Sequence, residues 1–212
     1  MGLGLEPLGE GTLYSGKVGN PDRISEDVRE KLIMPAAVDS VFDLAFWFCD
    51  RALNDNEYLQ PSKMQYLLYL SQAYYASAYN GKKLVPAIFV ADESGPLEPS
   101  VYRAWTQGRP NFEGPNQVPK EVATFGDSIW RRFGHHSSEY LAKLCKKSPP
   151  YVTAAKRGRR AEIHIEEMIE AFTRATNSPA VDQVVKPTIK RSHKGRVVQV
   201  KSWAPKVVKP PQ

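Results

Sequence analysis

Pro61 and Asn80-Gly81 bound a single long helix, and that helix decides which folds are open to this chain. Proline suits the first turn of a helix, and glycine readily takes the left-handed conformation that follows the last turn. Between the two signals, apolar and small side chains recur at three- and four-residue steps, at Met64, Leu67, Leu68, Ser71, Tyr75 and Ala78. This spacing predicts a helix with one buried face.

Four tyrosines of this helix lie partly off that face, namely Tyr66, Tyr69, Tyr74 and Tyr79. An aromatic flank of this kind forms either part of the core with its rim or a binding surface, because tyrosine is also enriched at interfaces. Both interpretations stay open at this point.

Apolar periodicity and the positions of proline and glycine predict five further helices. They are expected from Pro35 through Ala52, from Pro99 through Trp105, over residues 122–133 with Gly134 as the end, from a Ser138 cap to Pro149-Pro150, and over residues 165–172. In the fourth of them the side chains expected to point inward are Tyr140, Leu141, Leu144 and Cys145.

One short strand is predicted at residues 84–91, with Pro86 indicating an edge or a bulge, and residues 93–96 carry a turn signal. The fold class is therefore mainly α, a compact helical domain at residues 35–176 with a small β element. Residues 1–34 are glycine-rich and are expected to form a flexible arm. Residues 177–212 hold five prolines and only scattered valines, and are expected to form a disordered tail.

The formal net charge of +6 is concentrated in that tail, whose 36 residues hold eight basic side chains and one acidic one. Residues 1–176 carry the other 21 basic and 22 acidic side chains, so the body is nearly neutral. A phosphate-binding body is expected to carry a positive face, and this average gives no indication of one. Nucleic acid is therefore not the expected main partner.

No catalytic motif is recognisable, and we expect neither enzymatic activity nor a cofactor. The adjacent His135-His136, and His164 three residues before Glu167, are expected to be surface residues, not metal ligands. The two cysteines, Cys49 and Cys145, are expected to be structural thiols. No apolar stretch is long enough for a membrane span, and the first residues lack the order of a signal peptide, so we expect a cytoplasmic protein.

Several spaced motifs resemble the signature of the Panacea-domain family. The first runs from Leu59 to Ala73 as Leu-Gln-Pro-Ser-Lys-Met-Gln-Tyr-Leu-Leu-Tyr-Leu-Ser-Gln-Ala. The likeness continues through Gly81, Leu84, Gly95-Pro96 and Val101-Tyr102, and then through Ile129 to Gly134, Ser138, Leu141 and Leu144. It departs from the family at Cys145-Lys146, where Thr-His is usual, and at Pro150-Tyr151, where Pro-Trp is frequent.

Panacea proteins are antitoxins that neutralise co-encoded toxins by protein–protein contact, so the resemblance implies an antitoxin with a cognate protein toxin. One branch of the family is a proteolytic adaptor that delivers a toxin of the SocB kind to the ClpX unfoldase of the ClpXP protease. The long extra tail makes this branch the expected one. For toxin binding we single out residues around the long helix and the turn beyond the strand, namely Tyr66, Tyr69, Gly95, Pro96 and Tyr102.

The end of the tail carries a candidate tether. Lys206-Val207-Val208-Lys209 is similar to the short tail motif with which another adaptor, SspB, docks on ClpX, and Arg196-Val197-Val198 is a poorer second copy. A flexible tether raises the local concentration of its cargo to the order of millimolar, so a weak contact with ClpX suffices. Two alternatives remain: a stoichiometric antitoxin that needs no protease, and a nucleic-acid-binding regulator that uses the basic tail.

Overall fold

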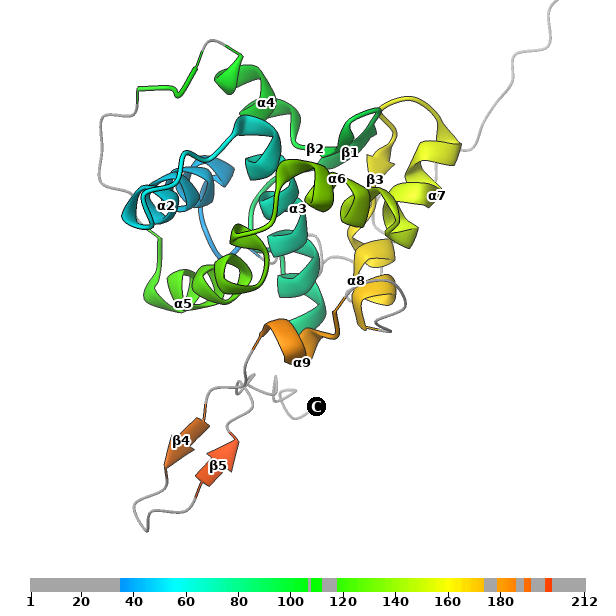
Figure 1. Ribbon diagram of the computed structural model, residues 1–212. Helices are drawn as coiled ribbons and strands as arrows, with labels where there is room; N and C mark the ends of the chain where they lie inside the picture. Colours follow the sequence, from blue (N-terminus) through cyan, green and yellow to red (C-terminus); the bar gives the residue numbers. More distant parts are fainter. Residues whose placement is uncertain are drawn as a thin grey trace, which may run out of the picture. The chain divides into compact units, whose positions relative to one another are not determined.

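The computed structural model describes residues 35–106, 108–111, 118–173 and 179–185, together with the backbone of two strands in the tail. Within these residues the protein is mainly helical, with one small three-stranded antiparallel sheet (Figure 1). The predicted arm at residues 1–34 and the tether motif Lys206–Lys209 lie outside the described residues.

Helix α3 (Pro61–Ala78) is the central element, and α2, α4, α5, α6, α8 and α9 all contact it. Its ends are those predicted: Pro61 is the first helical residue, and the Gly81 amide closes the last turn by donating to the Ala76 carbonyl at 2.8 Å. Asn80 and Gly81 both have positive φ, at 55° and 85°. Burial extends around almost the whole helix, not along one face, because elements pack on every side of it.

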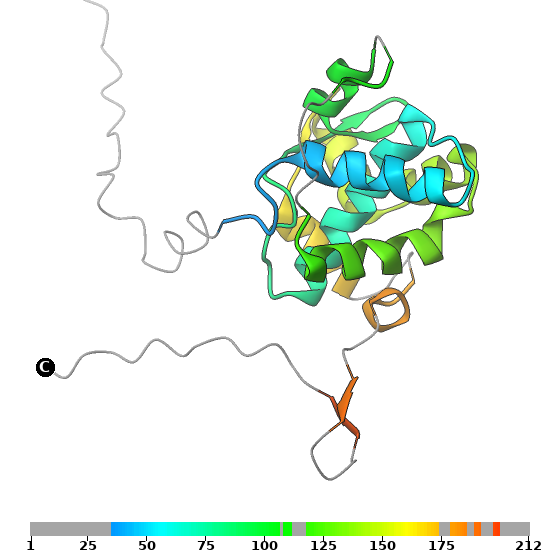
Figure 2. The ribbon, with the colours of Figure 1, turned by 90° about the vertical axis from the view of Figure 1, so that its left-hand side faces the viewer.

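Helix α2 (Val41–Asn54) begins six residues later than predicted. Ser40, not Pro35, provides the start signal, since its Oγ accepts a hydrogen bond from the Phe42 amide and Asp43 accepts one from the Ser40 amide. The apolar periodicity predicted for this helix is confirmed as a buried face, on which Phe48 is completely buried. Figure 2 shows α2 and α5 (Lys120–Ile129) side by side, where Gly126 allows close approach: a Cβ there would lie 2.7 Å from the Trp47 ring.

The sheet has the order β2-β1-β3. Helix α3 contacts β2, and α7 contacts β1 and β3. Strand β1 (Phe89–Asp92) pairs with β2 (Gly95–Leu97) in a tight hairpin in which Asp92 faces Gly95, and with β3 (Glu162–Ile163) on its other side. The predicted strand at 84–91 is too long. The amides of Leu84 and Val85 donate to Gln72 Oε1 of α3, at 3.2 and 3.1 Å, so a side chain replaces the strand ladder there.

Helix α4 (Pro99–Trp105) is found where predicted, and the helix predicted over 122–133 is α5 followed by a π-helical turn, η2 (Trp130–Gly134). Gly134 ends this segment for a steric reason. A Cβ on Gly134 would lie 2.6 Å from the Trp130 ring, so the ring occupies the space that any side chain would need.

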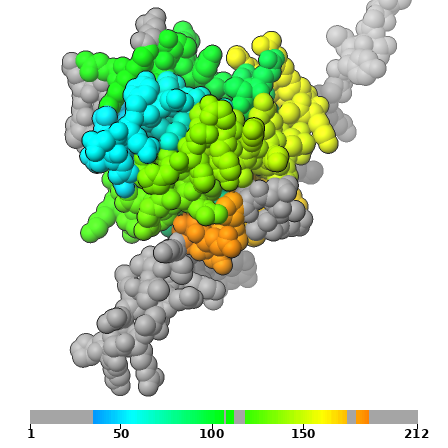
Figure 3. Space-filling view, viewed as in Figure 1, coloured from blue at the N-terminus to red at the C-terminus, as the bar shows by residue number. Residues whose placement is uncertain are grey.

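Helix α6 (Ser138–Lys146) is capped by Ser137, one residue before the predicted cap, because Ser137 Oγ accepts from the Tyr140 amide at 3.2 Å. Leu141 and Cys145 are buried as predicted. Tyr140 was predicted to point inward, but it lies at the edge of the apolar stripe and is 50% exposed. Figure 3 shows α6, in yellow-green, at the surface of the viewed face.

Pro149-Pro150 does end α6, but the same pair begins α7 (Pro149–Arg157), which the sequence analysis missed. Proline is tolerated in the first turn of a helix as well as it is after the last one. Helix α8 (Ile165–Thr173) follows β3 and packs along α3.

The tail begins later than residue 177. The Tyr74 hydroxyl of α3 donates to the Pro179 carbonyl at 2.8 Å, and Val184 of the short helix α9 (Val181–Val184) is 3% exposed. Residues 179–185 therefore belong to the helical body. Farther along, β4 (Ile189–Arg191) and β5 (Val197–Gln199) pair antiparallel, so part of the segment expected to be disordered has strand structure.

Candidate partner-binding surface

The structure buries four of the five residues predicted to contact a toxin. Tyr66 is 4% exposed and Tyr69 is not exposed at all, while Gly95 and Pro96 are buried in β2. Of the two interpretations of the tyrosine flank, the core is the one found for Tyr66, Tyr69 and Tyr74, because other elements cover α3 on almost every side, so Tyr66 and Tyr69 are not exposed contact residues. Tyr102, on α4, is the exception and is 50% exposed.

The buried residues hold the hairpin in place from beneath. The Tyr66 hydroxyl donates to the Ser94 carbonyl at 2.9 Å, and the Tyr69 hydroxyl bonds to Ser148 Oγ at 2.8 Å. Burial raises the pKa of both phenols, most strongly that of Tyr69, so they stay neutral hydrogen-bonding groups. These tyrosines fix the surface above them and do not form it.

The residues exposed above them come from three elements, the β1–β2 turn, α4 and the turn after α7; we call them the hairpin surface. Its members are Glu93, Ser94, Tyr102, Arg159 and Arg160. Figure 1 shows β1 and β2 between α4 and α7. Tyr102 lies within electrostatic range of the Arg160 guanidinium, so the two exposed residues are in the same region of the fold.

Arg160 is the best-fixed residue of the hairpin surface. Its φ is 55°, a left-handed conformation that a long side chain seldom takes, and its amide donates to the Ala91 carbonyl at 3.0 Å. Its Nε donates to Asp92 Oδ1 at 2.8 Å, while the side chain remains 53% exposed. The two Nη groups have no hydrogen-bond partner among the described residues, so they are available to a partner.

Asp92 anchors this arrangement from below. Its side-chain bond with Arg160, and then its bonds with Ser94, hold the pKa of the Asp92 carboxyl below the ordinary value. The Tyr151 hydroxyl also donates to the Asp92 carbonyl at 2.7 Å. The carboxylate is therefore ionised throughout the neutral range and keeps the Arg160 guanidinium in a fixed position.

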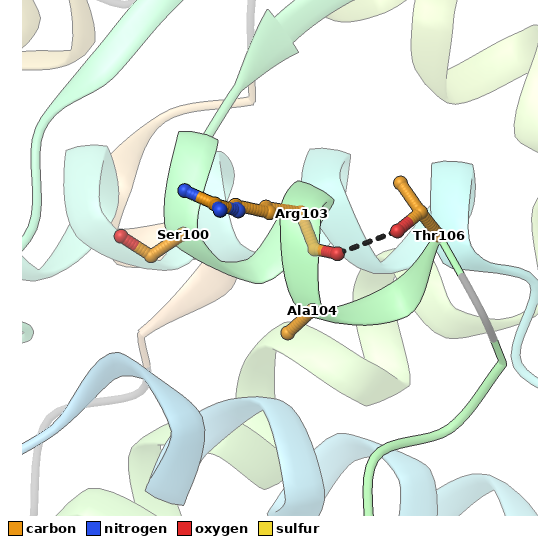
Figure 4. Close-up of a pocket in the computed structure, with 4 residues that line it drawn as sticks. All are labelled: Ser100, Arg103, Ala104 and Thr106. Atoms are coloured by element: carbon orange, nitrogen blue, oxygen red, sulfur yellow. Dashed lines mark hydrogen bonds between the residues drawn. The ribbon is translucent and has the colours of Figure 1, made fainter.

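A hollow of about 550 Å³ lies on α4 next to this surface, lined by Ser100, Arg103, Ala104 and Thr106. Figure 4 shows the Arg103 side chain lying along the helix on the Ser100 side, and the Thr106 hydroxyl donating to the Arg103 carbonyl at 2.7 Å. One guanidinium and two hydroxyls can bind a polar partner, but they supply no nucleophile with an adjacent base.

The other candidate chemical residues have structural roles. Burial raises the pKa of both Cys49 and Cys145, which makes each a poor nucleophile. His164 Nδ1 lies 3.9 Å from Glu162 Oε1, and the salt bridge of Glu167 is with Arg157. In the described part of the chain, no three His, Cys, Asp or Glu side chains could hold a metal ion together, and no helix is both long and apolar enough to cross a bilayer.

Sequence reasoning missed Arg159 and Arg160. The run Lys-Arg-Gly-Arg-Arg at 156–160 was the available signal, since glycine within a basic run indicates a turn that displays its arginines.

No family model, no curated protein and no solved structure matches this chain. The resemblance to Panacea domains therefore depends on the sequence motifs alone.

Proposed function

We propose that this protein is an antitoxin of the proteolytic-adaptor branch of the Panacea family, of which SocA is a member. It binds a cognate toxin through the hairpin surface and delivers it to ClpXP through its tail. The observation that supports the proposal most is the position of the residues that carry the family resemblance. Some of them, including Gln65, Tyr66, Tyr69, Gly95 and Val101, form a buried, hydrogen-bonded framework beneath the hairpin surface.

That framework joins α3 to the hairpin and to α4. Gln65 Oε1 accepts from the Glu98 amide at 2.7 Å, and Glu98 Oε2 accepts from the Val101 amide at 2.6 Å to cap α4. Tyr66 donates to the β1–β2 turn, and Gly95 leaves room for its ring. Motif residues with these roles specify the fold and orient Tyr102, whereas the partner is contacted by the residues above them.

The exposed chemistry suits protein recognition. Tyrosine and arginine are the residue types that, with tryptophan, contribute most at protein interfaces, and side chains fixed before binding lose less entropy. Arg160 is fixed by Asp92 and Tyr102 sits on a capped helix. These features favour a rigid binding surface over an enzyme cleft.

Replacing Tyr102 by alanine is expected to weaken toxin binding roughly 30-fold or more, the usual effect of removing an interface tyrosine that contributes about 2 kcal/mol. The probe is the small protein encoded in the neighbouring reading frame, if it arrests growth when expressed alone. Affinity is measured by calorimetry on the co-purified pair.

Tyr140→Ala is the matched control, because Tyr140 is also 50% exposed but lies on α6. It is expected to leave toxin affinity within about twofold, since a surface residue outside an interface changes little. Equal losses for the two variants, or none for Tyr102→Ala, would remove the hairpin surface from the proposal.

Deleting residues 201–212 is expected to abolish ClpXP-dependent degradation of the toxin while its affinity for the antitoxin is unchanged. The tether motif lies in this segment, and without it the local concentration of toxin at ClpX falls from the millimolar order to that in bulk solution. Degradation is followed on a gel with purified ClpXP and ATP. Unchanged degradation would favour the stoichiometric antitoxin instead.

A further inference from the structure

Helix α6 exposes a row of aromatic and basic side chains that the proposed function does not use. Tyr140, Lys143 and Lys147 follow one another at three- and four-residue steps, so they share one face, and Lys146 lies beside them. Tyr140 is 50% exposed and all three lysines are exposed. We call these four residues, with His136, the α6 face, and Figure 3 shows its helix uncovered on the viewed face.

The lysines of the α6 face have few acidic neighbours: Glu139, four residues before Lys143 on the same helix, interacts with it electrostatically but forms no salt bridge with it. Residues 141–160 hold seven basic side chains and no acidic one. The three arginines among them are paired, with Glu167, Glu93 and Asp92. Among the residues that the structure describes, no carboxylate oxygen lies within 4.0 Å of the Nζ of Lys143, Lys146 or Lys147.

Stabilisation of the helix end does not account for three lysines on one turn. A cation near the last turn of a helix contributes roughly 0.3–1 kcal/mol through the helix dipole. Each like-charged neighbour three or four residues away costs about 0.2–0.5 kcal/mol, and Lys147 is one turn from Lys143, to whose carbonyl its amide donates at 3.2 Å. The repulsion between these lysines therefore offsets part of the gain from the dipole, and an anion that lies between them would relieve that repulsion.

The aromatic pair next to the lysines indicates what kind of anion fits. The rings of His136 and Tyr140 are stacked, with centroids 4.3 Å apart and planes 25° apart. One face of the tyrosine is thus supported while the residue stays half exposed, which is a platform for another flat ring. A platform beside ammonium groups one helical turn apart is the combination that binds bases and phosphates of an unpaired strand.

We propose that the α6 face binds single-stranded nucleic acid, with a base stacked on Tyr140 and the phosphates on either side of it paired with Lys143 and Lys147. The near neutrality of the whole body conceals this local charge. The residues of this site belong neither to the basic tail nor to the hairpin surface, and the chemistry is common to DNA and RNA.

The test uses fluorescein-labelled 20-mers of oligo(dT), oligo(U) and a duplex, with the full-length protein and fluorescence anisotropy. Tyr140→Ala is expected to weaken oligo binding by about 5- to 150-fold, whereas Tyr140→Phe keeps the ring and the affinity. Lys143→Glu with Lys147→Glu is expected to weaken it at least 10-fold and to reduce the salt slope by about 1.4, at 0.7 per lost phosphate contact.

Lys82→Glu with Lys83→Glu is the matched charge control, since these exposed lysines follow α3 and change the net charge equally. This control distinguishes loss of the α6 face from a general loss of positive charge. Thermal unfolding of each variant checks that it is folded. Tighter binding of oligo(U) or of oligo(dT) supports the site and identifies its strand. Equal losses for both lysine pairs, no loss for Tyr140→Ala, or tighter binding of the duplex would overturn it.

Discussion

Replacing Gly95 by alanine is expected to destabilise the protein by about 2–6 kcal/mol. Gly95 has φ +139°, a conformation that costs a residue with a Cβ roughly 1–3 kcal/mol. A Cβ built there would also lie 2.7 Å from Cε1 of the buried Tyr66 ring, and such overpacking adds about 1–3 kcal/mol. The ring has little freedom to move because its hydroxyl is bonded to the Ser94 carbonyl. The free energy is measured by urea unfolding.

Gly158→Ala separates the two causes. Gly158 has nearly the same φ, +143°, but nothing lies within 4 Å of its added Cβ. It is expected to lose only the conformational part, about 1–3 kcal/mol, and both variants share the same effect on the unfolded chain. The double variant with Tyr66→Leu is expected to recover part of the additional loss at Gly95. Equal losses at the two glycines would show that the contact with Tyr66 adds nothing.

The long helix was predictable because its boundary signals are local. Pro61 needs no backbone partner at the first helical position, and Asn80-Gly81 closes the last turn within a few residues. The burial of its tyrosines could not be predicted from periodicity, because tyrosine occurs both in protein cores and at surfaces. What decided the matter was the number of elements from elsewhere in the chain that pack on α3.

The missed elements depend on contacts that local patterns do not report. Strand β3 has only two residues and exists because it pairs with β1, some seventy positions earlier in the chain. Helix α7 is hard to predict because Pro149-Pro150 is as typical of a helix end as of a helix start. In the same way, Ser137 and Ser138 differ as caps only in backbone geometry.

The candidate sites show the same division. The framework under the hairpin was visible as motif residues, whereas the exposed surface joins Tyr102 to Arg160 across the fold. The bond between Arg160 and Asp92 is a product of the β1–β3 pairing and of a positive φ, neither of which a residue pattern contains. The α6 face is the opposite case: its spacing and its scarcity of acidic residues are local, whereas the stacking of His136 on Tyr140 is known only from the structure.

Replacing Trp130 by alanine is expected to cost about 3–5 kcal/mol, as the removal of a completely buried aromatic side chain usually does. The ring joins α2, α3 and η2: its Nε1 donates to Asp55 Oδ2 at 2.7 Å, while Arg51 and Lys63 lie 5.9 and 5.6 Å from its centre. Losing it leaves a cavity and removes one partner of a carboxylate whose pKa is held low first by Arg51 and then by Trp130. Urea unfolding followed by circular dichroism measures the loss.

Trp130→Phe distinguishes the filled volume from the polar bond. It keeps most of the ring but no donor, so Asp55 retains Arg51 as its charged partner at 2.6 Å, and the expected loss is about 1–2 kcal/mol. The Trp130 ring fills the space that a side chain at position 134 would need. Trp130→Ala is therefore also expected to relieve part of the destabilisation caused by Gly134→Ala. Strictly additive losses in that double variant, or a loss below about 1 kcal/mol for Trp130→Ala, would mean that η2 is not held by this ring.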